Sequence, residues 1–255
     1  MECHKKKIDK AVESYFERNP INSYNLVEDG AGSHNSIYRG KNLGTKITNE
    51  QLANIKNGTF KDLFVGDYWM INSVKYMIAD FDYMYNVGDT ALKEHHIVVV
   101  PERSMYNHVM NDTDTTEGGY VASKMYTEGL NNALEYFKNA FGESHILTYR
   151  NILTTSVAKG QSINWAWQDR QIDIMSEVML LGQNIWSKSG YDVGCQKSQL
   201  NLFKHRHDVI QVERGWIWLR DVYSDSSFVR MTGHGYTDSS SASDLYGVRP
   251  FALIG

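Results

Sequence analysis

Cysteine and proline are scarce in this sequence, and long apolar runs are absent from it. Of its 255 residues, only Cys3 and Cys195 are cysteines and three are prolines. Two cysteines so far apart do not predict a disulfide framework, so stability must come from a packed core. No apolar run approaches the roughly 18 residues that span a bilayer, and the lysine-rich start lacks the apolar stretch of a signal peptide. These absences predict a chain that is synthesised in a cytoplasm and not inserted into a membrane.

An excess of positive charge is also missing. Lys and Arg number 26 against 30 Asp and Glu, which gives a net charge of −4 and an isoelectric point near 6.1. Domains that bind nucleic acid usually carry a clustered basic face, so DNA and RNA are not expected partners. The hydrophobic fraction of 42% is enough to build a full core. The chain is therefore predicted to form one large domain, or a main domain with an attachment.

The common signatures of catalytic and metal sites are absent as well. There is no glycine-rich phosphate loop and no Gly-x-Ser-x-Gly elbow. His95-His96 and the run from His205 to Asp208 are the only histidine clusters, whereas a metal site needs three or four converging ligands. We therefore predict no metal, no cofactor and no catalytic residues. A hydrolytic triad assembled from distant positions remains an open alternative.

The N-terminal region is predicted to form a helical arm. Apolar residues with helical spacing are Ile8, Ala11, Val12, Tyr15 and Phe16. Asn19-Pro20 would end this helix, and the polar, glycine-containing stretch that follows is typical of a linker. The sequence thus divides into an arm at 1–35 and a main domain at 36–255. The helix within 1–20 either anchors the protein to a partner or completes the core of its own domain.

Local signals in the first half of the main domain predict a helix and a hairpin. Thr48 and Gln51 stand at the spacing of a capping box, and Asn57-Gly58 supplies a stop, so a short helix is expected at 49–56. The apolar runs 68–71 and 74–79 flank Asn72-Ser73, which suits a two-residue hairpin turn with positive φ at its first position.

Further along the chain, one more strand and two longer helices are expected. A strand is predicted at 95–100, ended by Pro101. Apolar periodicity predicts one helix within 119–141 and a second at about 168–182. The fold class is therefore α+β, with a twisted antiparallel sheet and two main helices in addition to the N-terminal amphipathic helix.

The last forty residues hold a polar and aromatic run between two apolar segments, 216–221 and 247–255. Tyrosine in such a run offers rigid amphipathic area, while serine and aspartate offer adaptable hydrogen bonds, as in binding loops. The candidates for ligand contact within the predicted display loops 223–246 are Tyr223, Asp225, Ser226, Phe228, Arg230, Thr232, His234, Tyr236, Asp238, Ser239, Ser241, Asp244 and Tyr246. A solvated turn region is the alternative, but an idle loop gains little by exposing aromatic side chains.

The residues that flank this run are interpreted as scaffold. Trp218, Arg220 and Arg249 are expected to hold the frame, and Arg249 to pair with a carboxylate, for which Asp221 is a candidate. The tryptophans of the chain could line a sugar platform. The alternation in 216–219 instead favours a strand that is buried on both faces.

Several motifs together resemble a known family. They are 37–44, 64–69, 81–83, 111–113, Trp218-Leu219-Arg220-Asp221, a polar stretch with Gly233 and Gly235, and Ser243 with Gly247-Val248-Arg249-Pro250. These residues resemble C-type-lectin-like domains of the formylglycine-generating-enzyme type, which occur in phages and prophages of Gram-positive bacteria, and also the variable proteins of diversity-generating retroelements. The resemblance implies a C-type-lectin-like fold with its ligand face in the last strands and loops. The calcium-binding tripeptides of the lectins and the cysteine pair of the enzymes are not present in this chain.

The resemblance leads to three functional hypotheses. The first is a phage virion-surface protein, such as a tail-fibre adhesin, that attaches to a bacterial surface glycan or protein. It would be joined to other virion proteins of the capsid or tail through residues 1–20 and could form a homo-oligomer, for which a trimer is favoured. The second is a capsid or tail decoration protein with a mainly structural role, and the third is an enzyme acting on surface polymers.

Overall fold

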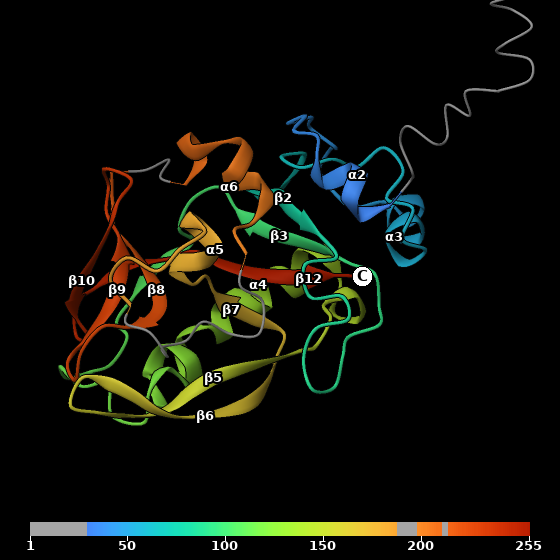
Figure 1. The fold of residues 1–255 in the computed structure, drawn as a ribbon. Coiled ribbons are helices and arrows are strands. Elements are labelled where there is room, and N and C mark those ends of the chain that lie inside the picture. Colours follow the sequence, from blue (N-terminus) through green and yellow to red (C-terminus); the bar gives the residue numbers. More distant parts are fainter. Residues whose placement is uncertain (1–29, 188–197, 211–213) are drawn as a thin grey trace, which may run out of the picture.

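Two five-stranded sheets and one long hairpin form the framework of the protein (Figure 1). The structure is a computed structural model that describes residues 30–187, 198–210 and 214–255. The strands are β1 (Tyr68–Ile71), β2 (Val74–Phe81), β3 (Ile97–Pro101), β4 (Tyr106–His108), β5 (Tyr149–Ala158), β6 (Gln161–Arg170), β7 (Ile172–Ile174), β8 (Ile217–Val222), β9 (Ser227–Met231), β10 (Thr237–Ser241), β11 (Tyr246–Val248) and β12 (Pro250–Ile254). All paired strands are antiparallel except β8 and β11, which meet in a parallel bridge. The predicted α+β class with mostly antiparallel pairing is therefore confirmed, although the strands form two main sheets instead of one.

The first sheet has the strand order β1-β2-β3-β12-β7. All five residues of β3 and all five of β12 are buried, as expected from their continuous apolar sequences. The hairpin of β1 and β2 is present as predicted. Both turn residues, Asn72 and Ser73, have positive φ, at 48° and 65°, which is the conformation that matches the twist of the two strands.

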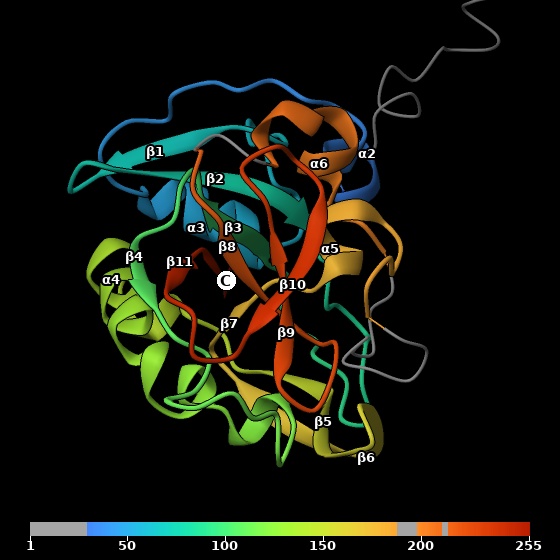
Figure 2. The same ribbon diagram turned by 90° about the vertical axis from the view of Figure 1, so that its left-hand side faces the viewer.

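The second sheet, in the order β10-β9-β8-β11-β4, lies on the side of the molecule that faces the viewer in Figure 2. From one edge to its centre, this sheet is an antiparallel meander of β10, β9 and β8. β11 joins this meander to β4 at the opposite edge. Residues that lie far apart in the sequence, around 106 and 246, are thereby brought next to one another.

Helices are few and short in the residues that the structure describes. They are α2 (Ala31–Asn35), α3 (Asn49–Lys56), α4 (Asn131–Phe141), α5 (Glu177–Leu181) and α6 (Asn201–His205), with 3₁₀ turns η2 (Tyr120–Ala122), η4 (Glu143–His145) and η5 (His207–Val209) and a π-helical turn η3 (Met125–Gly129). The predicted helix α3 is confirmed with its capping box, in which Thr48 accepts from the Gln51 amide and Gln51 accepts from the Thr48 amide. No helix in these described ranges is long and apolar enough to cross a bilayer.

The helix expected within 119–141 is present, but it is divided. The 3₁₀ turn η2 and the π-helical turn η3 precede α4, which ends before Gly142 as predicted. Its buried face carries Phe137 and Phe141, whose rings both lie 5.2 Å from the ring of Tyr76 on β2. The amphipathic face therefore covers the first sheet.

The helix predicted at about 168–182 is largely wrong. Residues 161–170 form β6, which pairs with β5 along its length, and 172–174 form β7 at the edge of the first sheet. Only α5, at 177–181, is helical, and it begins after Ser176, whose hydroxyl accepts from the Met179 amide. Met175 and Met179 are both buried. Their spacing in the sequence suits a helix as well as a strand followed by a short helix, so it did not distinguish the two.

The described chain begins with structure where a linker was expected. Residues 31–35 form α2, His34 is buried, and Asn35 exchanges two hydrogen bonds of 2.9 Å with the backbone of Phe81. The predicted helix within 1–20 and Cys195 lie outside the described residues.

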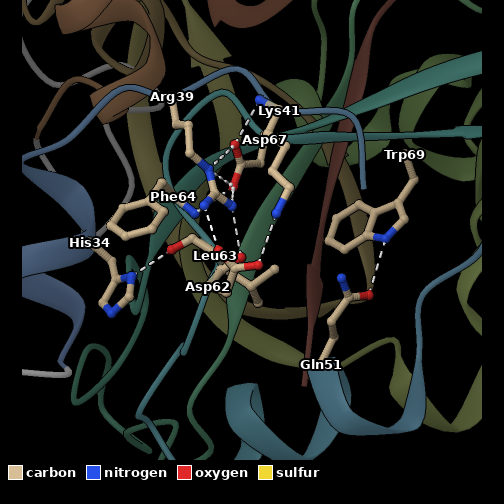
Figure 3. A network of polar contacts seen from close by, with 9 residues as sticks. All are labelled: His34, Arg39, Lys41, Gln51, Asp62, Leu63, Phe64, Asp67 and Trp69. Carbon is tan, nitrogen blue, oxygen red and sulfur yellow. Dashed lines mark hydrogen bonds and ion pairs between the residues drawn. The ribbon is translucent and has the colours of Figure 1, made fainter. Parts of the chain in front are cut away.

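A polar network ties this N-terminal segment to the first sheet (Figure 3). The carboxylate of Asp67, which is fully buried, accepts hydrogen bonds from Nε and Nη2 of Arg39 and from the amides of Lys41 and Phe64. Nη1 of Arg39 also reaches Asp62 at the surface, 2.5 Å away. Arg39 thus joins a buried carboxylate to an exposed one.

Candidate functional site

The predicted display loops 223–246 are mostly strand. Residues 227–231 and 237–241 are β9 and β10, paired in register from Ser227 opposite Ser241 to Met231 opposite Thr237. Only the connections around 223–226, 232–236 and 242–245 are turns. The candidate residues therefore do not share one loop. The turn 232–236 lies at one end of the β9–β10 pair, and the turns 223–226 and 242–245 lie at the other end, a five-residue strand of about 17 Å away.

Three of the candidates are buried and do not project as predicted. Phe228 is in the core and Arg230 is 8% exposed. Thr232 is also buried, and its hydroxyl donates to the carbonyl of Tyr236 at 2.8 Å, so it shapes the turn. In an antiparallel strand alternate side chains point to opposite faces, so part of any such run must turn inward.

Arg230 is the centre of a cluster on the outer part of the second sheet. Its guanidinium carbon lies 3.8 Å from the centre of the Trp216 ring and 5.5 Å from that of Tyr246. The guanidinium also pairs with Asp238 at 3.2 Å and donates to the hydroxyl of Ser240. A planar cation in contact with two aromatic rings, and held by a carboxylate, is fixed in orientation.

Tyr246 forms the second half of this cluster. Its ring lies 5.1 Å from Trp216 and 4.8 Å from Trp218, and its hydroxyl is 3.1 Å from both Asp244 and Ser240. Burial, together with the neighbouring Asp244 carboxylate, raises the pKa of Tyr246 above its usual value. Four of the predicted residues, Arg230, Asp238, Asp244 and Tyr246, are thus brought together here, with Trp216 as an additional member.

A hollow of about 430 Å³ adjoins the cluster. Its walls include Asn107, Arg214 and Leu245, together with Trp216 and Tyr246. Trp216 is 42% exposed and Leu245 is 60% exposed, so two large apolar groups remain accessible at its edge. Trp216, Arg214 and Asn107 were not among the predicted contact residues. The alternation in 216–219 favoured Trp216 as part of a strand buried on both faces, but β8 begins at Ile217 and Trp216 is exposed.

The remaining candidates lie elsewhere on the sheet. Tyr223 packs on Trp186 with ring centres 5.5 Å apart, and the Asp225 carboxylate accepts from the amide of Gly160 in the β5–β6 turn. His234 and Tyr236 are exposed and stack with their ring centres 6.3 Å apart at the opposite turn. The other half-exposed positions are Ser226, Ser239 and Ser241.

The predicted scaffold residues are all buried. Trp218 donates from its indole nitrogen to the carbonyl of His108 at 2.9 Å, and Arg220 pairs with buried Asp173 at 3.2 Å. Arg249 donates to backbone carbonyls. These interactions anchor β8 and β12 beneath the cluster.

The side-chain hydrogen bonds that Arg249 donates within the described residues go to backbone carbonyls. Its Nε donates to the carbonyl of Pro101, and its Nη1 donates to those of Val209 and Ile210. The proposed partner Asp221 accepts the amide of Glu177 at 2.7 Å. Arg249 therefore ties β12 to the end of β3 and to the segment that follows α6.

The histidine clusters have structural contacts. Nδ1 of His96 faces the carbonyl of Glu94 and its Nε2 faces the amide of Met84, which fits a neutral ring, and burial lowers the pKa of His96. His95 contacts the Asp82 carboxylate at 2.7 Å and stacks on Tyr85. In the described part of the chain, no group of three side chains is placed to hold a metal ion.

Comparison with known proteins adds no family assignment. No protein-family model, curated protein or solved structure matches the chain.

Proposed function

We propose that the protein is a recognition protein that binds a molecule on a bacterial surface through the outer part of its second sheet. The observation that carries this proposal is the stack of Arg230 on Trp216 and Tyr246 beside an open hollow. The cluster is held rigidly from within, while Trp216 stays partly exposed. A preorganised surface loses little conformational entropy on binding.

The geometry suits binding better than catalysis. Arg230 is engaged by Asp238, and the Tyr246 hydroxyl is engaged by Asp244 and Ser240. These polar groups hold one another in place, so they shape the surface. The proposed ligand is a surface glycan or protein of the bacterial host.

The resemblance of the sequence to C-type-lectin-like phage proteins supplies the biological setting of the proposal. The α+β architecture and the meander of β8, β9 and β10 near the end of the chain support a C-type-lectin-like fold. The protein would be synthesised in the host cytoplasm and carried on the virion surface, with residues 1–20 as its attachment to other virion proteins.

Binding to intact candidate host cells tests the proposal. The purified protein is displayed on beads, because multivalency adds about 10²–10⁴ in avidity to a weak single site. Trp216→Ala is compared with Trp165→Ala, since the two indoles are 42% and 43% exposed but Trp165 lies on the β5–β6 hairpin. We expect Trp216→Ala to weaken binding about tenfold or more and Trp165→Ala to leave it unchanged.

Two results would contradict this proposal. Equal binding by both variants, with thermal unfolding matched to the wild type, would remove the cluster from the contact surface. Absence of binding by the displayed wild-type protein would favour the alternative role of a capsid or tail decoration protein.

A further inference from the structure

The hollow beside Trp216 adjoins a second one. A cavity of about 490 Å³ lies between the β1–β2 turn, the loop 102–105 and Tyr136 of α4, and Ser104 lines both hollows. The loop 102–105 bridges the two sheets, since the Glu102 amide donates to Lys75 on β2 and the Met105 amide donates to Val248 on β11. In Figure 2, β4 lies below the β1–β2 hairpin, and β11 lies beside β4. The two hollows therefore adjoin at Ser104, and together they are called the groove.

Gly247 leaves room for Ser104 to pack against β11 where the two hollows meet. A Cβ atom at Gly247 would lie 2.6 Å from Cβ of Ser104 and 2.8 Å from its hydroxyl oxygen. Any side chain at Gly247 would push Ser104 away from β11 and raise the floor where the two hollows meet. The small residue therefore preserves the continuity of the groove.

The groove carries a surplus of positive charge in a chain whose net charge is −4. Its cations are Lys75, Arg103 and Arg214, and Glu102 is the acid that lines it. Nζ of Lys75 lies 2.7 Å from the carboxylate of Glu102 and forms an ion pair with it. Nε of Arg103 is 4.0 Å from the same carboxylate, and the Arg103 side chain is 59% exposed. Arg214 is exposed and forms no ion pair with the residues that the structure describes.

Two acids of the Trp216 cluster are already engaged. Asp238 pairs with Arg230, and Asp244 accepts from the hydroxyl of Tyr246. Among the described residues, Arg103 and Arg214 are the cations of the groove that have no carboxylate closer than 4.0 Å. Guanidinium groups recognise carboxylate and phosphate groups in a two-pronged geometry.

Exposed aromatic rings stand near the two ends of the groove. Tyr136 is 51% exposed in the first hollow, and Trp216 is 42% exposed in the second. Flat rings of this kind offer apolar faces with a polar edge, and the apolar faces of sugar rings stack on them. A lipid or an apolar helix would need a lining with fewer charges than this groove has.

We propose that the groove takes an acidic glycan chain, with Arg103 and Arg214 binding its acid groups and Tyr136 and Trp216 stacking on its sugar rings. This assignment rests on the proposed recognition function and names the ligand class of the same surface. An extended chain is required, because the two aromatic rings lie in different hollows on either side of Ser104.

Oligogalacturonate, a sugar chain with one carboxylate per ring, is the probe. Binding to the full-length protein is measured by titration calorimetry for wild type, for R103Q/R214Q, for Tyr136→Ala and for the control K46Q/K61Q, which removes two exposed charges elsewhere. We expect R103Q/R214Q to weaken binding at least about tenfold, because the variant loses the charge-assisted hydrogen bonds to the acid groups. Tyr136→Ala should weaken it as well, while the control should match the wild type.

Two further probes distinguish recognition of the sugar from nonspecific electrostatic binding of anions. The methyl-esterified oligomer keeps the sugar rings but loses the charge, and polyglutamate keeps the charge but lacks the rings. We expect both to bind more weakly than oligogalacturonate. Equal binding of polyglutamate, equal binding by R103Q/R214Q, or absence of oligogalacturonate binding by the wild type would each overturn the proposal.

The cell-binding experiment distinguishes this inference from the proposed function. Cell binding that depends on Trp216, together with no binding of oligogalacturonate, overturns the acidic-glycan assignment alone. Absence of cell binding by the displayed wild type overturns the recognition function itself. Matched thermal unfolding of all variants is expected, because both substituted arginines lie at the surface.

Discussion

The carboxylate of Glu177 and the hydroxyl of Thr237 are joined by a hydrogen bond of 2.5 Å in the interior. Glu177 is the first residue of α5, and Thr237 is the first residue of the edge strand β10. The same carboxylate accepts the amides of Ile185, Trp186 and Ser187. One buried acid therefore fixes both the segment 185–187 and the strand that carries Asp238.

The first prediction is that Glu177→Gln lowers the free energy of unfolding by about 3 kcal/mol, because an amide nitrogen would face donors that need an acceptor. Urea unfolding measures this change. Glu117→Gln is the matched control, since Glu117 is exposed, and it should stay within about 0.5 kcal/mol of the wild type.

A double-mutant cycle of Glu177→Gln with Thr237→Val measures the interaction between the two side chains. This variant removes only the hydroxyl and should cost about 1–2 kcal/mol. The double variant should cost less than the sum of the two single variants, since both remove the same contact. Strict additivity would show that Glu177 acts through the backbone amides alone.

The second prediction concerns the two carboxylates that share Arg39. Asp67 is fully buried, whereas the side chain of Asp62 is 62% exposed. Asp67→Ala should lower the free energy of unfolding by about 3–5 kcal/mol, because it leaves a guanidinium and two backbone amides without their acceptor. Asp62→Ala should cost less than about 1 kcal/mol, because water screens that pair. Similar losses for both variants, measured by urea unfolding, would refute the dominance of the buried pair.

Where the sequence predicted structure well, the determining contacts lie within a few residues. The helix at 49–56 depends on a capping box and on Gly58, whose φ is +68°, and all of these signals are local. The β1–β2 hairpin likewise depends on its own two turn residues. In both cases no distant partner was needed to decide the conformation.

The secondary-structure predictions were wrong where the conformation depends on pairing with a strand that lies elsewhere in the sequence. Residues 161–170 are a strand because β5 lies beside them, and the same apolar spacing around Met175 would also suit a helix. The sequence Thr-Asp-Ser-Ser-Ser of β10 has little intrinsic preference for a strand, so the pairing with β9 overrides it.

The candidate site was predicted only in part for the same reason. Tyr246, Asp238 and Arg230 stood out by residue type within one segment. Asn107 and Ser104 reach the site through the pairing of β4 with β11, over more than a hundred residues of intervening chain, and no sequence pattern marks that contact.

The third prediction is a pH dependence that arises from Asp80. Burial raises the pKa of this carboxyl to about 6 from 3.8, while hydrogen bonds from the backbone amides of Asn201 and Phe81 offset part of the rise. Because the folded-state pKa is the higher one, the folded protein binds this proton more tightly than the unfolded chain. The contribution of Asp80 to stability is therefore fully present below pH 3.8 and is lost as the pH rises through about 6.

Asp80→Asn isolates this contribution, because the amide does not titrate. The Phe81 amide keeps an acceptor in this variant, since Asn35 Oδ1 lies 2.9 Å from it. Between pH 4 and pH 7 the free energy of unfolding of the wild type should fall by about 2 kcal/mol relative to Asp80→Asn. Urea unfolding at several pH values measures the difference. A constant difference would mean that Asp80 keeps an ordinary pKa, because its hydrogen bonds with Asn201 and Phe81 would then balance the cost of burial.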